Sequence, residues 1–357
     1  MKKARFMALL MALLLLAGCA SDKGGTQETG TTQPEVTDAC LTATGFAPEQ
    51  EAMTINGVSI PMGLYVFLLC DNAAYVEEYS GVAFSDNAEL RSYVQEQTLE
   101  MLRQQAIVEQ LAQEYDVTLS EETTAYLAEQ HTADIDYFGS EAEYERQLLL
   151  RGLTPELWDR LSAAGYLYLQ LNELTAQEGS ALYLSRDELL SYAREKNYVT
   201  ADHILLLTQD ASTGGSLDEE TVKKQRALAD DLHAQLAASD DPVALFDQLA
   251  DEYGEDPGRE SNPNGYTLCE TDSFVDEFKA AALALEENAF SDVVETTYGY
   301  HILLRRPLDE DAACDTVRER LFNERITDAM ADAQITYCDG FDSLDPMKIY
   351  ETVSAAQ

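Results

Sequence analysis

The stretch that decides the fold is Val293-Val294-Glu295-Thr296-Thr297-Tyr298-Gly299-Tyr300-His301-Ile302-Leu303-Leu304-Arg305. β-Branched and aromatic residues on both sides of Gly299 predict two short strands, because such side chains pack well on a pleated surface. Glycine can take the positive φ that a tight turn between the strands requires. His301 interrupts the apolar run of the second strand. We therefore expect a β-hairpin that holds an imidazole among apolar side chains.

A second predicted strand carries a histidine in the same local context. It is Ala201-Asp202-His203-Ile204-Leu205-Leu206-Leu207, and it shares the tripeptide His-Ile-Leu with the first stretch. The whole chain has only four histidines, so two in matching strands indicate a common site. The alternative for each is a hydrogen-bonded core histidine. We interpret the other two, His131 and His233, as residues on helix faces.

Composition limits the functions that the chain can have. Its 357 residues suffice for two or three domains, and a hydrophobic content of 45% supports real cores. The formal net charge of −43 argues against nucleic acid or anionic lipid headgroups as partners, because like charges repel. Such a surface serves solubility, and it also attracts basic unfolded segments weakly. The sequence leaves both interpretations open.

The first residues have the pattern of a secretory signal. Basic residues precede the apolar run Phe6–Leu16, which is too short to span a membrane. Leu16-Ala17-Gly18-Cys19 then resembles the lipobox of bacterial lipoproteins. The resemblance implies lipidation of Cys19 and a protein that is anchored to the membrane rather than spanning it. An ordinary signal with an incidental cysteine is the alternative.

The remaining cysteines predict no metal site. There are five of them, with no close Cys-x-x-Cys pair, and their spacing nominates no disulfide. They are Cys40, Cys70, Cys269, Cys314 and Cys338. We expect Cys70, within an apolar run, to be a small buried side chain.

The chain changes character near Tyr198. Near Met53 the sequence predicts a short strand, a turn at Asn56-Gly57 and a second extended segment. Residues 61–197 are then predicted to be almost entirely helical, from their apolar periodicity and from helix-start signals such as Ser185 with Glu188. Residues 198–307 then alternate strands and helices, which predicts one small α+β domain. Residues 309–333 form an amphipathic helix without a core of its own, and we expect it to pack on the earlier helices.

Residues 198–307 resemble a parvulin-type peptidyl-prolyl cis/trans isomerase domain. The resemblance rests on the order and spacing of short motifs over most of this region. They are Ala201-Asp202-His203-Ile204-Leu205, Phe246-Asp247-Gln248-Leu249-Ala250-Asp251-Glu252-Tyr253, Gly254-Glu255-Asp256-Pro257, Asn264-Gly265-Tyr266, Phe274-Val275-Asp276-Glu277-Phe278, Phe290-Ser291-Asp292-Val293-Val294-Glu295-Thr296 and Tyr298-Gly299-Tyr300-His301-Ile302-Leu303.

The whole architecture is similar to that of the PrsA/SurA-type extracytoplasmic foldases. The resemblance implies an α+β fold in which a parvulin-like domain, with a four-stranded antiparallel sheet and surrounding helices, is inserted in an all-α chaperone domain. The expected organisation is a lipoprotein signal peptide in 1–18, a flexible tether in 19–50, an N-terminal helical chaperone domain in 51–197, the isomerase domain in 198–307, a C-terminal helix packing on the helical domain in 308–335, and a tail in 336–357.

Isomerisation of a prolyl bond needs neither a nucleophile nor a metal nor a cofactor. The barrier is ~18–20 kcal/mol because the twisted amide loses its conjugation, so a dry pocket and a fixed polar frame suffice. His203 and His301 are predicted to face each other and to fix their tautomers through Thr296 or a backbone group. The resemblance places Asp256 near the substrate carbonyl. Phe274 and Phe278, four residues apart on one expected helix face, are predicted to wall the proline ring together with Leu268. The alternatives are a core role for the two phenylalanines and a turn-forming role for Asp256.

Three functions remain to be distinguished. The first is a membrane-anchored foldase whose partners are unfolded secreted polypeptides that contain proline, as a monomer or a homodimer. The second is a non-catalytic holdase with a degenerate domain, because Gly265-Tyr266-Thr267-Leu268-Cys269-Glu270 lacks the second glycine and the phenylalanine common in parvulins, and Phe274 stands where methionine is common. The third, a small-ligand lipoprotein, requires an alternating βα pattern that the chain lacks. No basic cluster follows His203, so phospho-specific substrates are not expected.

Overall fold

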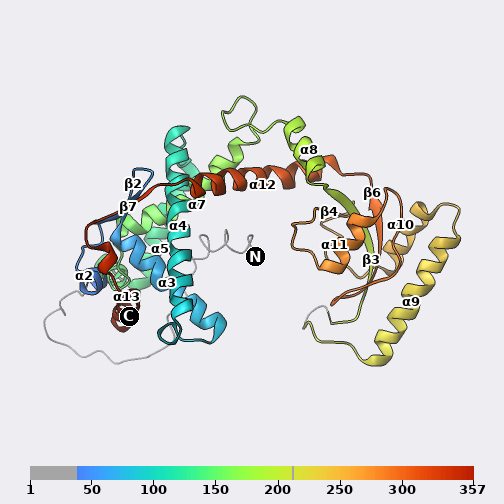
Figure 1. Ribbon diagram of the computed structural model, residues 1–357, viewed down its shortest axis with the longest axis horizontal. Coiled ribbons are helices and arrows are strands. Elements are labelled where there is room, and N and C mark those ends of the chain that lie inside the picture. Colours follow the sequence, from blue (N-terminus) through green and yellow to red (C-terminus); the bar gives the residue numbers. More distant parts are fainter. Residues whose placement is uncertain (1–37, 211–212) are drawn as a thin grey trace. The chain divides into compact units, whose positions relative to one another are not determined.

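The computed structural model describes residues 38–210 and 213–357, and it divides into two compact units (Figure 1). The first unit is built from two stretches of chain, up to Tyr183 and from Phe322 onward, and the second is Leu184–Leu321. The second unit is thus inserted in the sequence of the first, as expected. The predicted signal peptide, Cys19 and most of the predicted tether lie outside the described residues.

The first unit is dominated by helices. In helix α3 the first twelve residues are almost all buried, because Met62 to Ala73 are apolar at nearly every position. Capping side chains start several of the others, as their sequences predict: Ser120 and Ser140 each accept the backbone N–H three residues on. The helices are α2 (Ala39–Thr44), α3 (Met62–Ser80), α4 (Ala88–Glu114), α5 (Glu121–Phe138), α6 (Glu141–Leu149), α7 (Pro155–Leu174) and α13 (Pro346–Ala356), with 3-10 turns η2 (Phe84–Asp86) and η3 (Phe341–Ser343).

A small sheet accompanies these helices, so the first unit is not entirely helical. β1 (Glu51–Ile55) and β2 (Val58–Pro61) form the predicted hairpin. Asn56 and Gly57 have φ values of 50° and 83°, the left-handed pair that a two-residue hairpin turn requires. The third strand, β7 (Ile335–Tyr337), pairs antiparallel with β1.

Two sequence expectations about the ends of this unit are wrong. Residues 336–357 are not an extended tail: β7 completes the sheet, and α13 buries Ile349 and Val353 in the core. Structure also begins before Met53, because Asp38 caps α2 and that helix buries Cys40. Both segments acquire their order from distant partners rather than from a strong local pattern. Cys70 is buried, as expected.

The second unit contains the predicted four-stranded antiparallel sheet, in the order β4-β3-β6-β5. Its long central strands are the two histidine stretches, β3 (Val199–Leu207) and β6 (Gly299–Arg306), with β4 (Tyr266–Leu268) and β5 (Val294–Glu295) at the edges. Helices α9 (Glu219–Ala238) and α10 (Pro242–Tyr253) cover one face, and α11 (Asp276–Ala284) covers the other (Figure 1). The predicted α+β class is confirmed.

Alternation along β3 sorts its side chains between the two faces. Ile204 and Leu206 pack with α9 and α10 around Phe246. Val199 and Ala201 pack with α11 around Phe278. His203 lies on this second face, since it follows Val199 and Ala201 at a spacing of two. Gly265 has a φ of 91°, and a Cβ at this position would stand 2.7 Å from backbone atoms of Ala201 and Asp202, so glycine lets the chain approach β3 closely.

The units divide at other residues than the expected boundaries of 197/198 and 307/308. Helix α8 (Arg186–Glu195) and the first part of α12 (Glu310–Ala331) belong to the second unit. They share a core cluster with Tyr198 and Cys269, to which Leu189 and Val317 contribute. The later part of α12, through Phe322 and Ile326, packs in the first unit as the sequence predicts.

Candidate active site

The two strand histidines lie side by side on the α11 face of the sheet. In the β3–β6 pairing His301 is opposite Leu205 and His203 is opposite Leu303, so the two imidazoles are diagonal neighbours on one face. Their Nδ1 atoms are 3.0 Å apart, and the rings stack with centroids at 5.1 Å and an angle of 27°. His203 is 7% exposed and His301 3% exposed. The pair is therefore held in a nearly dry environment.

The hairpin positions a hydroxyl on the far nitrogen of His301. Thr296 donates its backbone N–H to the carbonyl of Gly299 at 2.9 Å, and its Oγ1 lies 2.8 Å from His301 Nε2. The backbone N–H of Tyr298 donates to the same Oγ1 at 3.1 Å. Gly299 is needed here because a Cβ would stand 2.1 Å from the Leu206 carbonyl oxygen of β3. The glycine thus serves close strand approach as well as the turn.

Asp256 approaches the pair from the loop after α10. Its Oδ2 is 3.0 Å from His203 Nε2 and accepts the Tyr266 phenol at 2.7 Å, and its Oδ1 accepts the Gly258 N–H at 3.0 Å. Burial alone would raise the pKa of Asp256, but these three partners together lower it to about 2. The carboxylate is therefore ionised at neutral pH. Burial and the contact with Asp256 raise the pKa of Tyr266, so its phenol stays protonated as a donor.

The charges fix the direction of the hydrogen bonds. Burial, and then the neighbouring His203, lower the pKa of His301 to about 3, so its imidazole is neutral. When both imidazoles are neutral, only one arrangement offers Asp256 a donor from His203: Thr296 Oγ1–H donates to His301 Nε2, His301 Nδ1–H donates to His203 Nδ1, and His203 Nε2–H points toward Asp256. This last contact is short but poorly aligned for a hydrogen bond, so it is chiefly electrostatic.

An aromatic cluster adjoins the imidazoles. The ring of Phe278 in α11 packs T-shaped with both imidazoles, with centroids 5.2 Å from His203 and 5.7 Å from His301. Phe274 stacks on Phe278 at 5.6 Å and meets Tyr266 at 5.8 Å. Phe274 precedes the first residue of α11, so it does not share a helix face with Phe278 as the spacing predicts, although the two rings do lie together. Phe274 is partly exposed, and this is where the cluster meets solvent.

The structure thus brings six of the sequence-predicted residues together around the imidazoles, and the seventh, Leu268, packs with Phe278 in the core. Leu268 has no exposed surface, so it supports the cluster from within the core and presents no surface of its own. Tyr266 is a site residue that we did not single out from the sequence. The sequence could have identified it, because Tyr266 lies in the strand after the Asp256 loop and its phenol is a hydrogen-bond donor for that carboxylate.

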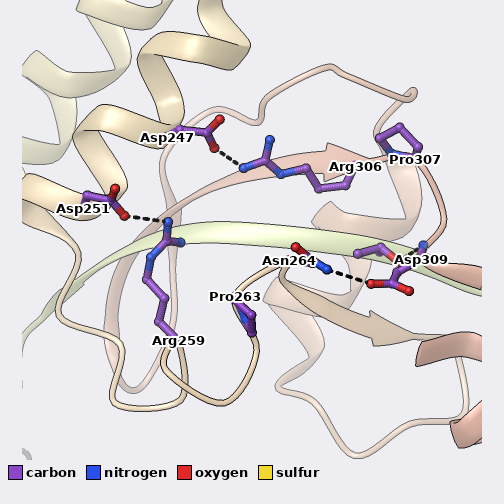
Figure 2. A pocket seen from close by; sticks show the side chains of 9 residues that line it. Asp247, Asp251, Arg259, Pro263, Asn264, Arg306, Pro307 and Asp309 are labelled. Carbon is purple, nitrogen blue, oxygen red and sulfur yellow. Dashed lines mark hydrogen bonds and ion pairs between the residues drawn. The ribbon is translucent and has the colours of Figure 1, made fainter. Parts of the chain in front are cut away.

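A separate pocket of about 540 Å³ opens on the other face of the sheet (Figure 2). Its charges are paired: Arg306 contacts Asp247, and Arg259 lies 3.1 Å from Asp251. Both arginines also bind the buried carboxylate of Asp202, at 2.8 and 2.9 Å. Because both guanidinium groups are already paired with carboxylates, we interpret the pocket lining as a structural salt-bridge network. The pocket lies apart from the two histidines.

Within the part of the chain that the structure describes, no group of three or more histidine, cysteine or acidic side chains is arranged to hold a metal ion. No helix among these same residues is both long and apolar enough to cross a membrane.

Comparison with known proteins finds one matching domain family and several similar foldases and chaperones. Residues 187–304 match the family described as "PPIC-type PPIASE domain". The foldase protein PrsA of Halalkalibacterium halodurans is 30% identical over 213 residues, which cover 57% of this chain and 54% of that protein. The chaperone SurA of Pseudomonas fluorescens is 30% identical over 112 residues, covering 29% of this chain and 25% of that one. The chain therefore spans less than two thirds of these relatives.

Solved structures of similar proteins include PrsA of Bacillus anthracis and the foldase PrsA of Streptococcus pneumoniae. The first has 16% identity and a TM-score of 0.26, covering 72% of this chain and 94% of that one. The second has 22% identity and a TM-score of 0.28, covering 73% and 83%. Such low scores carry no weight of their own, so the sequence matches decide. By those matches, residues 187–304 are similar to PPIC-type, or parvulin, domains, and longer stretches of the chain are similar to PrsA foldases.

Proposed function

We propose that this protein is an extracytoplasmic foldase that catalyses cis/trans isomerisation of prolyl bonds in secreted or envelope proteins. The observation that supports this most strongly is the stacked imidazole pair, held between Thr296 and Asp256 and bordered by Phe274 and Phe278. The domain match and the PrsA and SurA relatives agree with it.

Each part of the site lowers the barrier in a different way. Phe274 offers its ring to the pyrrolidine of the substrate, which aligns the prolyl bond beside the imidazoles. A planar amide carries more negative charge on its carbonyl oxygen than a twisted one, because conjugation moves electrons there. The Asp256 carboxylate near that oxygen therefore disfavours the planar form more than the twisted form. Because the twisted amide is also less polar, a dry site favours it further.

The hydrogen-bond chain through the two imidazoles keeps this frame rigid. Thr296, His301 and His203 are joined in series by contacts of 2.8 and 3.0 Å, so neither imidazole can turn without breaking a buried hydrogen bond. The frame needs no reorganisation when the amide twists. Neither histidine acts as a nucleophile in this mechanism.

A turnover assay on the full chain tests the proposal. We expect the protein to accelerate cis-to-trans conversion of a proline-containing tetrapeptide in a protease-coupled assay, in proportion to its concentration. A folded chain that leaves the uncatalysed rate of roughly one event in 10–100 s unchanged would contradict it.

The alternative is a non-catalytic holdase, and one observation favours chaperone binding by the first unit in either case. That unit exposes several large aromatic side chains, including Tyr75 at 59%, Tyr79 at 85% and Tyr137 at 53%. Exposed apolar surface of this kind suits extended client segments. Suppression of client aggregation without peptide turnover would favour the holdase.

We also propose that Cys19 carries a lipid that anchors the protein outside the cytoplasm, on the basis of Leu16-Ala17-Gly18-Cys19. Replacement Cys19→Ser is expected to move the protein from the membrane fraction to the soluble extracytoplasmic fraction, because the apolar run before it is too short to span a bilayer. Fractionation and immunoblotting would measure this. Full membrane retention of the variant would refute the anchor.

A further inference from the structure

A buried ion pair holds the segment that carries Phe274. Residues 269–275 connect β4 to α11, and Asp272 within them is only 9% exposed. Its Oδ2 accepts the backbone N–H of Cys269 at 2.8 Å. Its Oδ1 lies against the guanidinium of Arg320, which comes from α12. The carboxylate thus ties the beginning of this segment to a helix that follows the sheet.

Arg320 contacts the same segment at further points. It donates through Nη1 to Thr271 Oγ1 at 2.5 Å and lies 3.6 Å from the Cys269 sulfur. Its guanidinium also lies over the Tyr198 ring, 5.6 Å from the centroid. In the described part of the chain, Arg320 is the cation that is paired with the Asp272 carboxylate, while Lys279 donates to the Asp272 backbone carbonyl at 3.2 Å.

The far end of the segment is where the proline site begins. Phe274 lies two residues before α11, so helical hydrogen bonds do not fix its backbone. Its ring is placed by stacking on Phe278, and Phe278 touches both imidazoles. The position of Phe274 therefore depends on how firmly residues 269–273 are held.

We propose that Arg320 is a positioning residue for the proline site, which it serves by holding residues 269–275 so that Phe274 stays stacked on Phe278. This inference rests on the function proposed above for that site. It also extends the working unit beyond residues 187–304, the part that matches the domain family, into α12.

Loss of the guanidinium has a specific consequence. Asp272 would remain as a buried carboxylate without its counter-charge, a costly state that is relieved when the segment opens to water. Phe274 would then leave Phe278, while the imidazole pair, Thr296 and Asp256 keep their contacts. Substrate binding should therefore weaken more than the chemical step.

The test uses the full chain in four forms: wild type, Arg320→Met, the double variant Arg320→Met with Asp272→Asn, and Arg318→Met as the control. Arg318 is on the same helix and donates to the Leu184 carbonyl at 3.1 Å. For Arg320→Met we expect faster hydrogen exchange in residues 269–275 and a KM for a proline peptide raised about tenfold, with kcat within about twofold of wild type.

The double variant removes the unpaired charge and keeps an acceptor for the Cys269 N–H, so it should restore both slow exchange and KM. Arg318→Met should change neither. Unchanged exchange in Arg320→Met, a loss confined to kcat, or no recovery in the double variant would overturn the inference. A wild-type chain without turnover would overturn the proposed isomerase instead, and the exchange comparison would still decide the role of Arg320.

Discussion

His301→Ala is expected to lower kcat/KM for a proline-containing peptide about 100-fold, the loss typical of removing one preorganised polar group from an active site. The imidazole is the central member of the chain from Thr296 to His203, with contacts of 2.8 and 3.0 Å on its two nitrogens. Its removal frees His203 to rotate and admits water beside the aromatic cluster. The protease-coupled assay measures the effect.

Matched controls separate this effect from a general loss of folding. His233→Ala removes a half-buried imidazole on α9 in the same unit, away from the imidazole pair, and should leave the rate unchanged. Thr296→Val removes the hydroxyl that orients His301, and we expect a smaller loss of about tenfold, whereas Thr297→Val at the exposed neighbouring position should be neutral. A His301→Ala chain that is folded and as fast as wild type would remove the proposed mechanism.

Acidification is expected to destabilise the second unit in a window set by His301. Its pKa falls from 6.5 to about 3 on folding. Between pH 6.5 and pH 3 the imidazole is therefore protonated in the unfolded state and neutral in the folded state. The stability that depends on neutral His301 is complete above pH 6.5 and is lost as the pH falls toward 3. The linkage gives a loss of up to about 3 kcal/mol at pH 4.

The measurement compares urea unfolding of wild type and His301→Gln at pH 7 and pH 4, followed by circular dichroism. The difference between the two proteins isolates this imidazole from the many surface carboxylates. Asp256 acts in a lower window: its pKa falls from 3.8 to about 2, so its contribution is present above pH 3.8 and is lost below it. If wild type and His301→Gln lose the same free energy of unfolding between pH 7 and pH 4, then burial does not keep His301 in its neutral form.

Local chemistry explains why much of the second unit could be predicted from the sequence. The His-Ile-Leu stretches have the composition of buried strands, and Gly299 marks the turn that brings Thr296 toward His301. Both histidines fall on strands of one small domain, and their meeting on one sheet face requires that β3 pairs antiparallel with β6 in the observed register. Asp256 was predicted as a site residue only from the order of the parvulin-like motifs, because its loop has no distinctive local pattern beyond its turn formers.

Other features depend on contacts that sequence reasoning did not reach. Phe274 was expected on the helix with Phe278, but α11 begins at Asp276 and the stacking comes from the fold. Tyr266 becomes a site residue only because β4 pairs with β3. The last strand and α13 look weak locally and are ordered by pairing with β1 and by burial in the first unit.

The amino-acid sequence by itself determined the strands, the helix starts and the Asn56-Gly57 hairpin, because these follow from side-chain periodicity and turn chemistry within a few residues. Only the tertiary structure decided which nitrogen faces which partner, that Tyr266 supports Asp256, and that Arg320 meets Asp272. Those outcomes depend on distances between residues far apart in the chain, and burial then sets their strength by excluding water.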